Sequence, residues 1–196
     1  MSQPPSIERI AELQQLITQF AGVERIYYLP GLGRKDADTD HSYGLALTCW
    51  YLQPIIAPEL DLLEIFKLAM AHDLVELHAG DAYIFDTEAV KGKEQRERAA
   101  LARLKDDWPD FPGMADYAEE YMDKASEEAK FVKAVDKMLP VILCEQSGTA
   151  EWERLQVTLE MQRKHKVSMH VSPYISPYYE KLMDWLEGCG NILKDE

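Results

Sequence analysis

Apolar residues recur at helical spacing along most of this 196-residue chain. The clearest stripe covers residues 7–20 and follows Ser6, a residue type suited to cap a helix. Similar stripes follow at about 41–54, 62–71, 114–124 and 126–143. No stretch sustains the alternation expected of a β-strand. The pattern predicts an all-α fold, a compact multi-helix bundle of about seven or eight helices.

The remaining segments are more polar. Residues 22–40 are predicted as a loop, 87–108 as a strongly charged helix, 152–164 as an amphipathic helix and 173–188 as a final helix rich in aromatic residues. We expect a single domain over residues 1–196. Its core would come from about residues 7–145, with C-terminal helices at 151–188 packed on it.

Composition narrows the possible partners and compartment. The chain has 35 acidic and 21 basic residues, a net charge of −14, which disfavours nucleic acids and anionic membranes as partners. Its three cysteines have no metal-type spacing, and neither a signal sequence nor a membrane-length apolar run is recognisable. These features favour a cytoplasmic protein and still allow a small phosphorylated ligand.

The run His72-Asp-Leu-Val-Glu-Leu-His-Ala-Gly-Asp81 is the densest group of chemically active residues. On a helix, Glu76 would lie beside both His72 and Asp73, because residues three and four apart share a face. Gly80 would cap this helix and leave Asp81 just beyond its end. Nitrogen and oxygen ligands this close together suit a divalent metal ion. Taken alone, the run is better explained as a helix end that happens to be polar, because a His-Asp pair is common by chance.

Two further residues could join such a site. His41 would lie in the first turn of the second helix, which Pro54 is expected to end, although a histidine there is more often a hydrogen-bonded core residue than a ligand. Asp136 lies among apolar residues of a later helix, four positions before Pro140. The proline removes a helical hydrogen bond beside Asp136, so the aspartate is either a ligand or a locally bonded residue at a bend.

Cationic residues near these positions suggest contacts with phosphate. Arg25, Arg34 and Lys35 lie in the predicted loop, which is either a phosphate-contacting segment or a solvated connection. Lys93 opens the charged helix and follows Asp81 closely enough to reach the same site. Most other charges of that helix would form a solvated face.

Together, His41, His72-Asp73 and Asp136 match an H…HD…D signature. In this signature the chain resembles the HD-domain phosphohydrolase superfamily. Three longer runs, Asp40-His41-Ser42, HDLxExxxGD over residues 72–81 and the segment 128–137, resemble its bacterial 5′-deoxynucleotidase branch, and the resemblance covers about residues 7–145. The chain departs from that branch after Arg25, where Ile26-Tyr27-Tyr28 replace the usual glycine and tryptophan, and at Tyr43-Gly44, which replace the commoner tryptophan and arginine. These departures concern the sugar preference rather than the chemistry.

The resemblance implies a role for each matching residue. His41, His72, Asp73 and Asp136 would bind one divalent ion, which the ligand set leaves open among Mn, Co, Fe, Ni, Zn and Mg. Glu76 would be the acid or base beside a metal-bound water, Asp81 would contact the sugar or position the substrate, and Arg25 would grip the phosphate with help from Arg34, Lys35 or Lys93. A single ion is expected because residues 79–164 contain no histidine to serve a second one.

The implied activity is removal of the 5′-phosphate from nucleoside monophosphates, with deoxynucleosides preferred, by a homodimer. Two alternatives remain open. The first is an HD phosphohydrolase that acts on a phosphodiester or a nucleotide pyrophosphate. The second is a non-catalytic helical module that binds a metal or a nucleotide.

Overall fold

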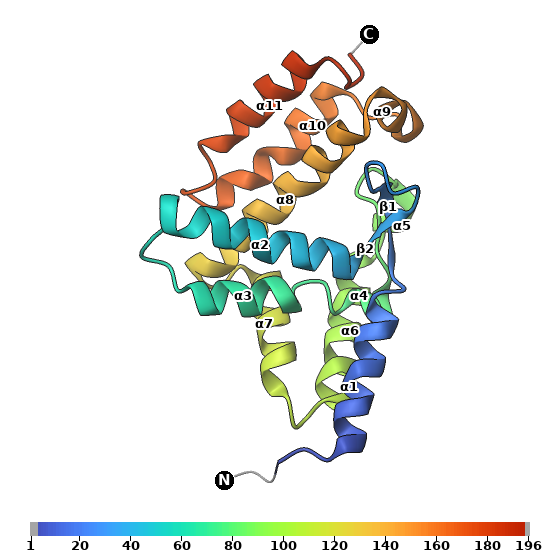
Figure 1. Ribbon diagram of the computed structural model, residues 1–196, viewed down its shortest axis with the longest axis vertical. Coiled ribbons are helices and arrows are strands. Elements are labelled where there is room, and N and C mark those ends of the chain that lie inside the picture. Colours follow the sequence, from blue (N-terminus) through green and yellow to red (C-terminus); the bar gives the residue numbers. More distant parts are fainter. Residues whose placement is uncertain (1–3, 195–196) are drawn as a thin grey trace.

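The computed structural model describes residues 4–194 and is predominantly helical, which confirms the predicted fold class (Figure 1). Within this range lie eleven α-helices, one 3₁₀ helix and a small two-stranded sheet. None of the helices in the described range is long and apolar enough to cross a bilayer. The elements are α1 Ile7–Phe20, β1 Glu24–Tyr28, β2 Lys35–Ala37, α2 Asp38–Ile56, α3 Leu62–Ala71, α4 Glu76–Ala79, α5 Thr87–Val90, α6 Lys93–Asp107, α7 Pro112–Asp123, α8 Glu127–Ser147, α9 Thr149–Leu155, α10 Leu159–Lys166, η1 Val167–Val171 and α11 Tyr178–Cys189.

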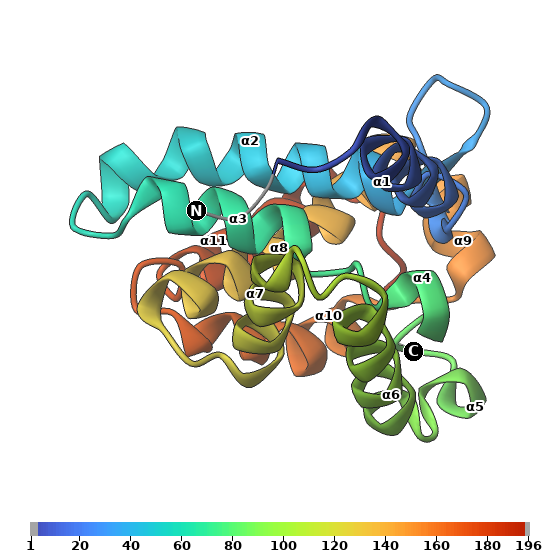
Figure 2. The same cartoon turned by 90° about the horizontal axis from the view of Figure 1, so that it is seen from below.

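The central helix is α8. It packs against α2, α3 and α7 on one side and against α9, η1 and α11 on the other, while β1 also contacts it (Figures 1 and 2). Its N-terminus is capped by Ser126, whose hydroxyl oxygen accepts a hydrogen bond from the Ala129 N–H at 3.0 Å. The helix continues through Pro140 to Ser147. This single helix therefore contacts both the helices that precede it in the chain, α2, α3 and α7, and the elements that follow it, α9, η1 and α11.

The buried apolar side chains form two clusters. The larger one surrounds α8 and includes Leu68 of α3, and the smaller one joins α1, α4, α6 and α7 around Leu104 and includes Val75. His72 and Asp73 lie between Leu68 and Val75 in the sequence. The segment that carries them is therefore anchored at both ends by different parts of the core, which limits its freedom.

Several predicted elements need correction. Lys35–Ala37 and Glu24–Tyr28 pair as antiparallel strands inside the segment predicted to be a loop. The second helix runs two residues past Pro54, to Ile56. The predicted helix at 87–108 is two helices because Gly92, with φ +67°, interrupts it, and the helix at 152–164 is likewise divided near Gln156, with φ +54°. The final helix begins at Tyr178 instead of residue 173. These two interruptions, together with the separation of α4 from α3, account for the larger number of helices.

Candidate functional site

The His72-Asp73 pair lies at a turn and not within one helix. Helix α3 ends at Ala71, His72 is its C-cap, and a new short helix, α4, begins at Glu76. The backbone nevertheless stays near-helical, since the Glu76 N–H donates to the Asp73 carbonyl at 2.8 Å. Gly80 caps α4 with φ +74°, as predicted. The turn directs His72, Asp73 and Glu76 toward a common space.

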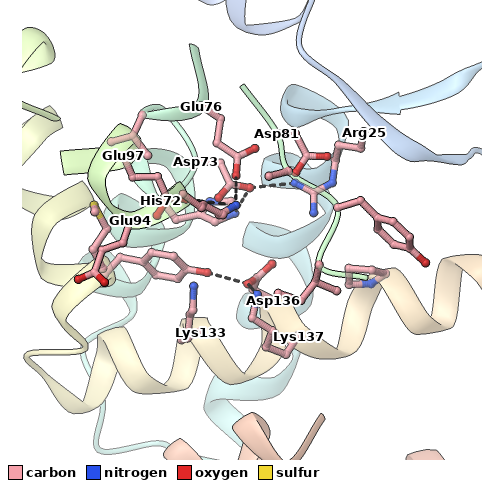
Figure 3. Close-up of a pocket in the computed structure, with 18 of the residues that line it drawn as sticks. Arg25, His72, Asp73, Glu76, Asp81, Glu94, Glu97, Lys133, Asp136 and Lys137 are labelled. Carbon is pink, nitrogen blue, oxygen red and sulfur yellow. Dashed lines mark hydrogen bonds and ion pairs between the residues drawn. The ribbon is translucent and has the colours of Figure 1, made fainter. Parts of the chain in front are cut away.

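Three separate segments bring the predicted metal ligands together (Figure 3). One nitrogen each from His41 and His72 and one oxygen of Asp73 lie within 4.8 Å of one another. His41 comes from the first turn of α2, and its Nε2 is 3.0 Å from Asp136 Oδ1 on α8. All but Asp73 are at least nine-tenths buried. Asp136 is 63 positions after Asp73 in the sequence and thus lies close to the His72–Asp73 pair in space.

The proton positions of this group suit a cation. His72 Nδ1 is 2.9 Å from the Ala69 carbonyl oxygen, which only accepts, so Nδ1 carries a proton. In neutral His72, Nε2 then presents a lone pair; it has no hydrogen-bond partner among the described residues, although Asp73 Oδ2 lies 2.9 Å away. The Nε2 lone pair and the Asp73 oxygen, both electron-rich, would bind one positive ion together. Burial and the charge of Arg25 lower the pKa of His41 to about 4, so its imidazole is neutral at pH 7, the form that binds metals. These residues therefore fit a divalent metal.

Arg25 extends from β1 into a cluster of carboxylates. Its Nη1 donates to Asp73 Oδ2 at 2.9 Å and lies 3.3 Å from Asp38 Oδ1, and its Nε is 3.6 Å from Asp36 Oδ2. The guanidinium is only 9% exposed. Burial, followed by the negative charge of Asp73, raises the pKa of Asp38 to about 7. Arg25 is thus beside the predicted metal ligands, but its charge is already shared among three carboxylates.

Glu76 lies beside the same carboxylates, with one oxygen within 4.8 Å of an oxygen of Asp38 and of Asp73. One of its carboxylate oxygens, Oε1, is 3.2 Å from Lys93 Nζ, and Oε2 has no hydrogen-bond partner among the described residues. Burial, reinforced by the charge of Asp73, raises the pKa of Glu76 well above its ordinary value. Asp81 lines the same pocket, and burial also raises its pKa. A carboxyl group that holds a proton this readily is suited to acid–base chemistry.

Arg34 and Lys35 lie elsewhere. Arg34 forms a two-pronged ion pair with Asp40, at 2.6 and 3.0 Å, and Lys35 Nζ pairs with Glu24 at 3.2 Å. Neither Arg34 nor Lys35 is among the described residues that line the pocket. Both side chains are well exposed, so the structure favours the solvated interpretation for these two cations. Lys93, by contrast, is in the pocket as expected.

The pocket also contains residues to which the sequence alone assigned no role. Lys133 and Lys137 project into it from α8, the helix that carries Asp136 (Figure 3). His165 and Lys166 reach it from the end of α10, just beyond the helix predicted at 152–164. Tyr121 donates a hydrogen bond to Asp136 Oδ2 at 2.7 Å. The spacing of Lys133 and Lys137, four residues apart around Asp136, is a signal that sequence reasoning could have used. The approach of α10 has no such local signal.

The pocket has a volume of about 360 Å³. This lies within the range of sites for small molecules and cofactors. His72, Asp73, Glu76 and Asp81 line one side of the pocket, and Lys133 and Lys137 of α8 line the other (Figure 3). Lys166 of α10 also lines the pocket. The arrangement combines a candidate metal site, a buried acid–base group and several cations, which together suit a phosphorylated ligand.

Comparisons with known proteins agree with this arrangement. A family model described as "HD domain" matches residues 23–174. The protein named 5′-deoxynucleotidase HDDC2 from Xenopus laevis is 28% identical over 131 residues, which are 65% of this chain and 64% of that protein. The protein of the same name from Danio rerio is 26% identical over 139 residues, 69% of this chain and 68% of its own. The match to the frog protein thus spans slightly less than two-thirds of that relative's length.

Solved structures share the fold. One is described as a predicted metal-dependent phosphohydrolase from Magnetospirillum magnetotacticum; it has a TM-score of 0.79 and 24% identity and covers 94% of this chain and 98% of its own. A conserved hypothetical protein from Pyrococcus furiosus has a TM-score of 0.61 and 24% identity, covering 91% of this chain and 99% of its own. The family model matches well over half of the chain, including the predicted ligands His41, His72, Asp73 and Asp136. The chain belongs to the HD domain family.

Proposed function

We propose that this protein is a metal-dependent phosphomonoesterase that removes the 5′-phosphate from nucleoside monophosphates, with deoxynucleosides preferred. The convergence of His41, His72, Asp73 and Asp136 from three segments, with the buried Glu76 beside them, is the observation that carries this proposal. The names of the 5′-deoxynucleotidase relatives support the choice of substrate class.

In this proposal His41, His72, Asp73 and Asp136 hold one divalent ion. The bound ion would polarise the phosphoryl group and lower the pKa of water far below its bulk value, towards about 7. Glu76 accepts a proton from the attacking water or delivers one to the leaving 5′-oxygen. Its burial supports this role, because a raised pKa brings a carboxyl group nearer to neutral pH, where proton transfer in both directions is efficient.

Three other pocket residues, Lys93, Asp81 and Arg25, bind and position the substrate. Lys93 is within 3.2 Å of Glu76 and keeps a positive charge beside the acid–base group. Asp81 contacts the sugar or orients the nucleotide at the end of α4. Arg25 holds Asp73 in place through an ion pair of 2.9 Å and lines the pocket in which the substrate phosphate binds. The products are a nucleoside and inorganic phosphate.

A substrate panel tests the proposal. Purified protein supplied with Mn²⁺ or Co²⁺ would be assayed for phosphate release from deoxynucleoside and ribonucleoside 5′-monophosphates, 3′-monophosphates and a phosphodiester. We expect release from the 5′-monophosphates, loss of activity with a chelator and recovery when metal is restored. Cleavage of the diester without cleavage of any monophosphate would reject the proposed substrate class.

We also propose that the protein acts in the cytoplasm as a homodimer. The three cysteines are all free, two of them buried, which suits a reducing compartment. Helix α2 presents an exposed apolar row, Leu47, Trp50, Tyr51 and Ile55. Their spacing places them on one helix face, where a second copy could cover them. This face is a better candidate for the subunit contact than the late aromatic helix α11.

A further inference from the structure

Helix α10 contributes a buried cation that the proposed chemistry does not use. Lys166 is the last residue of this helix, is 4% exposed and lines the pocket. No hydrogen bond or ion pair to its ammonium group occurs among the described residues. Lysine is rarely this buried unless it is paired, because its charge loses the solvation of water. The described residues of the protein therefore supply no counter-ion for the Lys166 ammonium group.

The charges around Lys166 make this burial more costly. After desolvation, the largest influence on its ammonium group is the repulsive charge of Lys137, and the pKa of Lys166 is lowered to about 7. Lys133 shares the wall, and burial and Lys137 lower its pKa to about 8. Asp136 attracts the Lys166 ammonium group, but its oxygens are already engaged by His41, Tyr121 and Lys137. An anion between these lysines would relieve the repulsion.

Arg25 is less available than these lysines for binding an anion. Three carboxylates surround its guanidinium, at 2.9, 3.3 and 3.6 Å. Lys133, in contrast, contacts the Tyr121 ring at 4.2 Å and has no carboxylate within ion-pair distance among the described residues. Lys133 and Lys137 thus lie on the α8 side of the pocket, across from Arg25 (Figure 3). Lys166 of α10 lines the same pocket.

We propose that Lys133, Lys137 and Lys166 form a phosphate-binding subsite on the α8–α10 wall of the pocket. The inference rests on the proposed phosphohydrolase function and deepens it, since it assigns phosphate recognition to a wall that the family resemblance did not indicate. The bound group is either the phosphate that is cleaved or a second phosphate elsewhere on the nucleotide. Both present oxygens that accept charge-assisted hydrogen bonds from ammonium groups.

Substitution of Lys166 by methionine tests the subsite. Methionine has a similar length, is compatible with burial and removes only the charge and the donors. The matched control is Lys164→Met, which removes the same charge from the same helix at a side chain that is 74% exposed and pairs with Glu160. Steady-state kinetics would be measured with a deoxynucleoside 5′-monophosphate and with the corresponding 3′,5′-bisphosphate.

Each outcome has a distinct meaning. If the subsite holds the phosphate that is cleaved, Lys166→Met raises KM for both substrates about ten-fold or more with little change in kcat. If it holds a second phosphate, only the bisphosphate loses affinity by this factor. In either case Lys164→Met matches the wild type. Equal kinetics for Lys166→Met and the wild type on both substrates would overturn the subsite.

Calorimetric titration with inorganic phosphate separates this inference from the proposed function. A wild-type protein that hydrolyses neither substrate would reject the function. The titration would still report on the subsite, because Lys166→Met should weaken phosphate binding about ten-fold relative to Lys164→Met. Unchanged phosphate affinity would again count against the subsite.

Discussion

At the scale of single residues, the proposed chemistry depends most on the carboxyl group of Glu76. It is 5% exposed, and only one of its oxygens has a partner, Lys93. Glu76→Gln keeps the shape of the side chain but cannot exchange a proton, so kcat should fall by about 10²–10⁴-fold while bound metal stays constant. Glu94→Gln, an exposed side chain at the rim of the same pocket, is the control and should change little. Full activity in Glu76→Gln would remove this residue from the mechanism.

The metal ligands allow a second test at this scale. His72 turns an unpartnered Nε2 toward Asp73, so His72→Ala should lose most of its bound divalent metal as measured by elemental analysis of the purified protein. The control is His78→Ala, six residues later. Its imidazole faces Asp107, 3.9 Å away, outside the proposed site. Retention of a full metal complement by His72→Ala would show that the ligand assignment is wrong.

Some residues of the candidate site could be predicted from the sequence, and others could not. The residues of the HD signature occur in a recognisable order within longer characteristic runs, so His41, His72, Asp73 and Asp136 could be named before their proximity was known. Arg34 and Lys35 were chosen for charge and loop position alone, and the structure pairs both with nearby surface carboxylates. Lys166 could not be found because only tertiary packing brings α10 to the pocket, and nothing local in the sequence reports that contact.

At the scale of elements, the backbone that follows α4 requires a glycine at position 80. Gly80 adopts φ 74° and ψ 149°, a conformation that residues with a side chain rarely tolerate. Gly80→Ala should therefore lower the free energy of unfolding by about 1–3 kcal/mol and reduce kcat, since Asp81 follows directly. Urea denaturation and steady-state kinetics would measure both effects.

Gly44 is the matched control for this substitution. It lies inside α2 in helical conformation, and a Cβ placed there would meet nothing within 4 Å. Gly44→Ala should raise the free energy of unfolding by about 1 kcal/mol, because alanine is the better helix former. If Gly80→Ala and Gly44→Ala changed stability in the same direction, the backbone explanation for Gly80 would be wrong.

Elements with strong apolar periodicity were predicted well, and the interruptions were not. The predicted bounds of α1 and the predicted start of α3 agree with the structure because caps at Ser6 and Asp61 reinforce the apolar stripe. The predicted continuation of α3 to Gly80 is wrong, since the chain turns after Ala71. The hairpin of β1 and β2 was missed because its strands are only five and three residues long and alternate weakly. Their pairing depends on packing against α8 and α2. Short strands of this kind are specified by tertiary context more than by their own residues.

At the scale of the whole molecule, the pocket is assembled from both ends of the chain. β1 supplies Arg25, and α10 supplies Lys166, although 140 positions separate them in the sequence. The family resemblance was drawn from residues 7–145, and the family model extends the match to residue 174. The C-terminal helices therefore do more than cover the core, because they complete the wall of the candidate site.

The exposed row on α2 yields the last prediction, on assembly. Leu47 and Tyr51 are 49% and 70% exposed, one helical turn apart. If a second copy covers this face, the double substitution Leu47→Glu/Tyr51→Glu would bury like charges at the contact and shift the protein from dimer to monomer. Light scattering after gel filtration measures the mass, with circular dichroism to confirm folding.

Trp185→Glu is the control for this test. Trp185 lies on α11, is 41% exposed and belongs to the other apolar surface considered for the subunit contact. We expect this variant to remain dimeric, because α11 presents fewer exposed large apolar side chains than α2. A wild-type protein that is monomeric would reject the dimer. Dissociation by Trp185→Glu but not by the double substitution would transfer the interface to α11 and leave the row on α2 as a solvent-exposed surface.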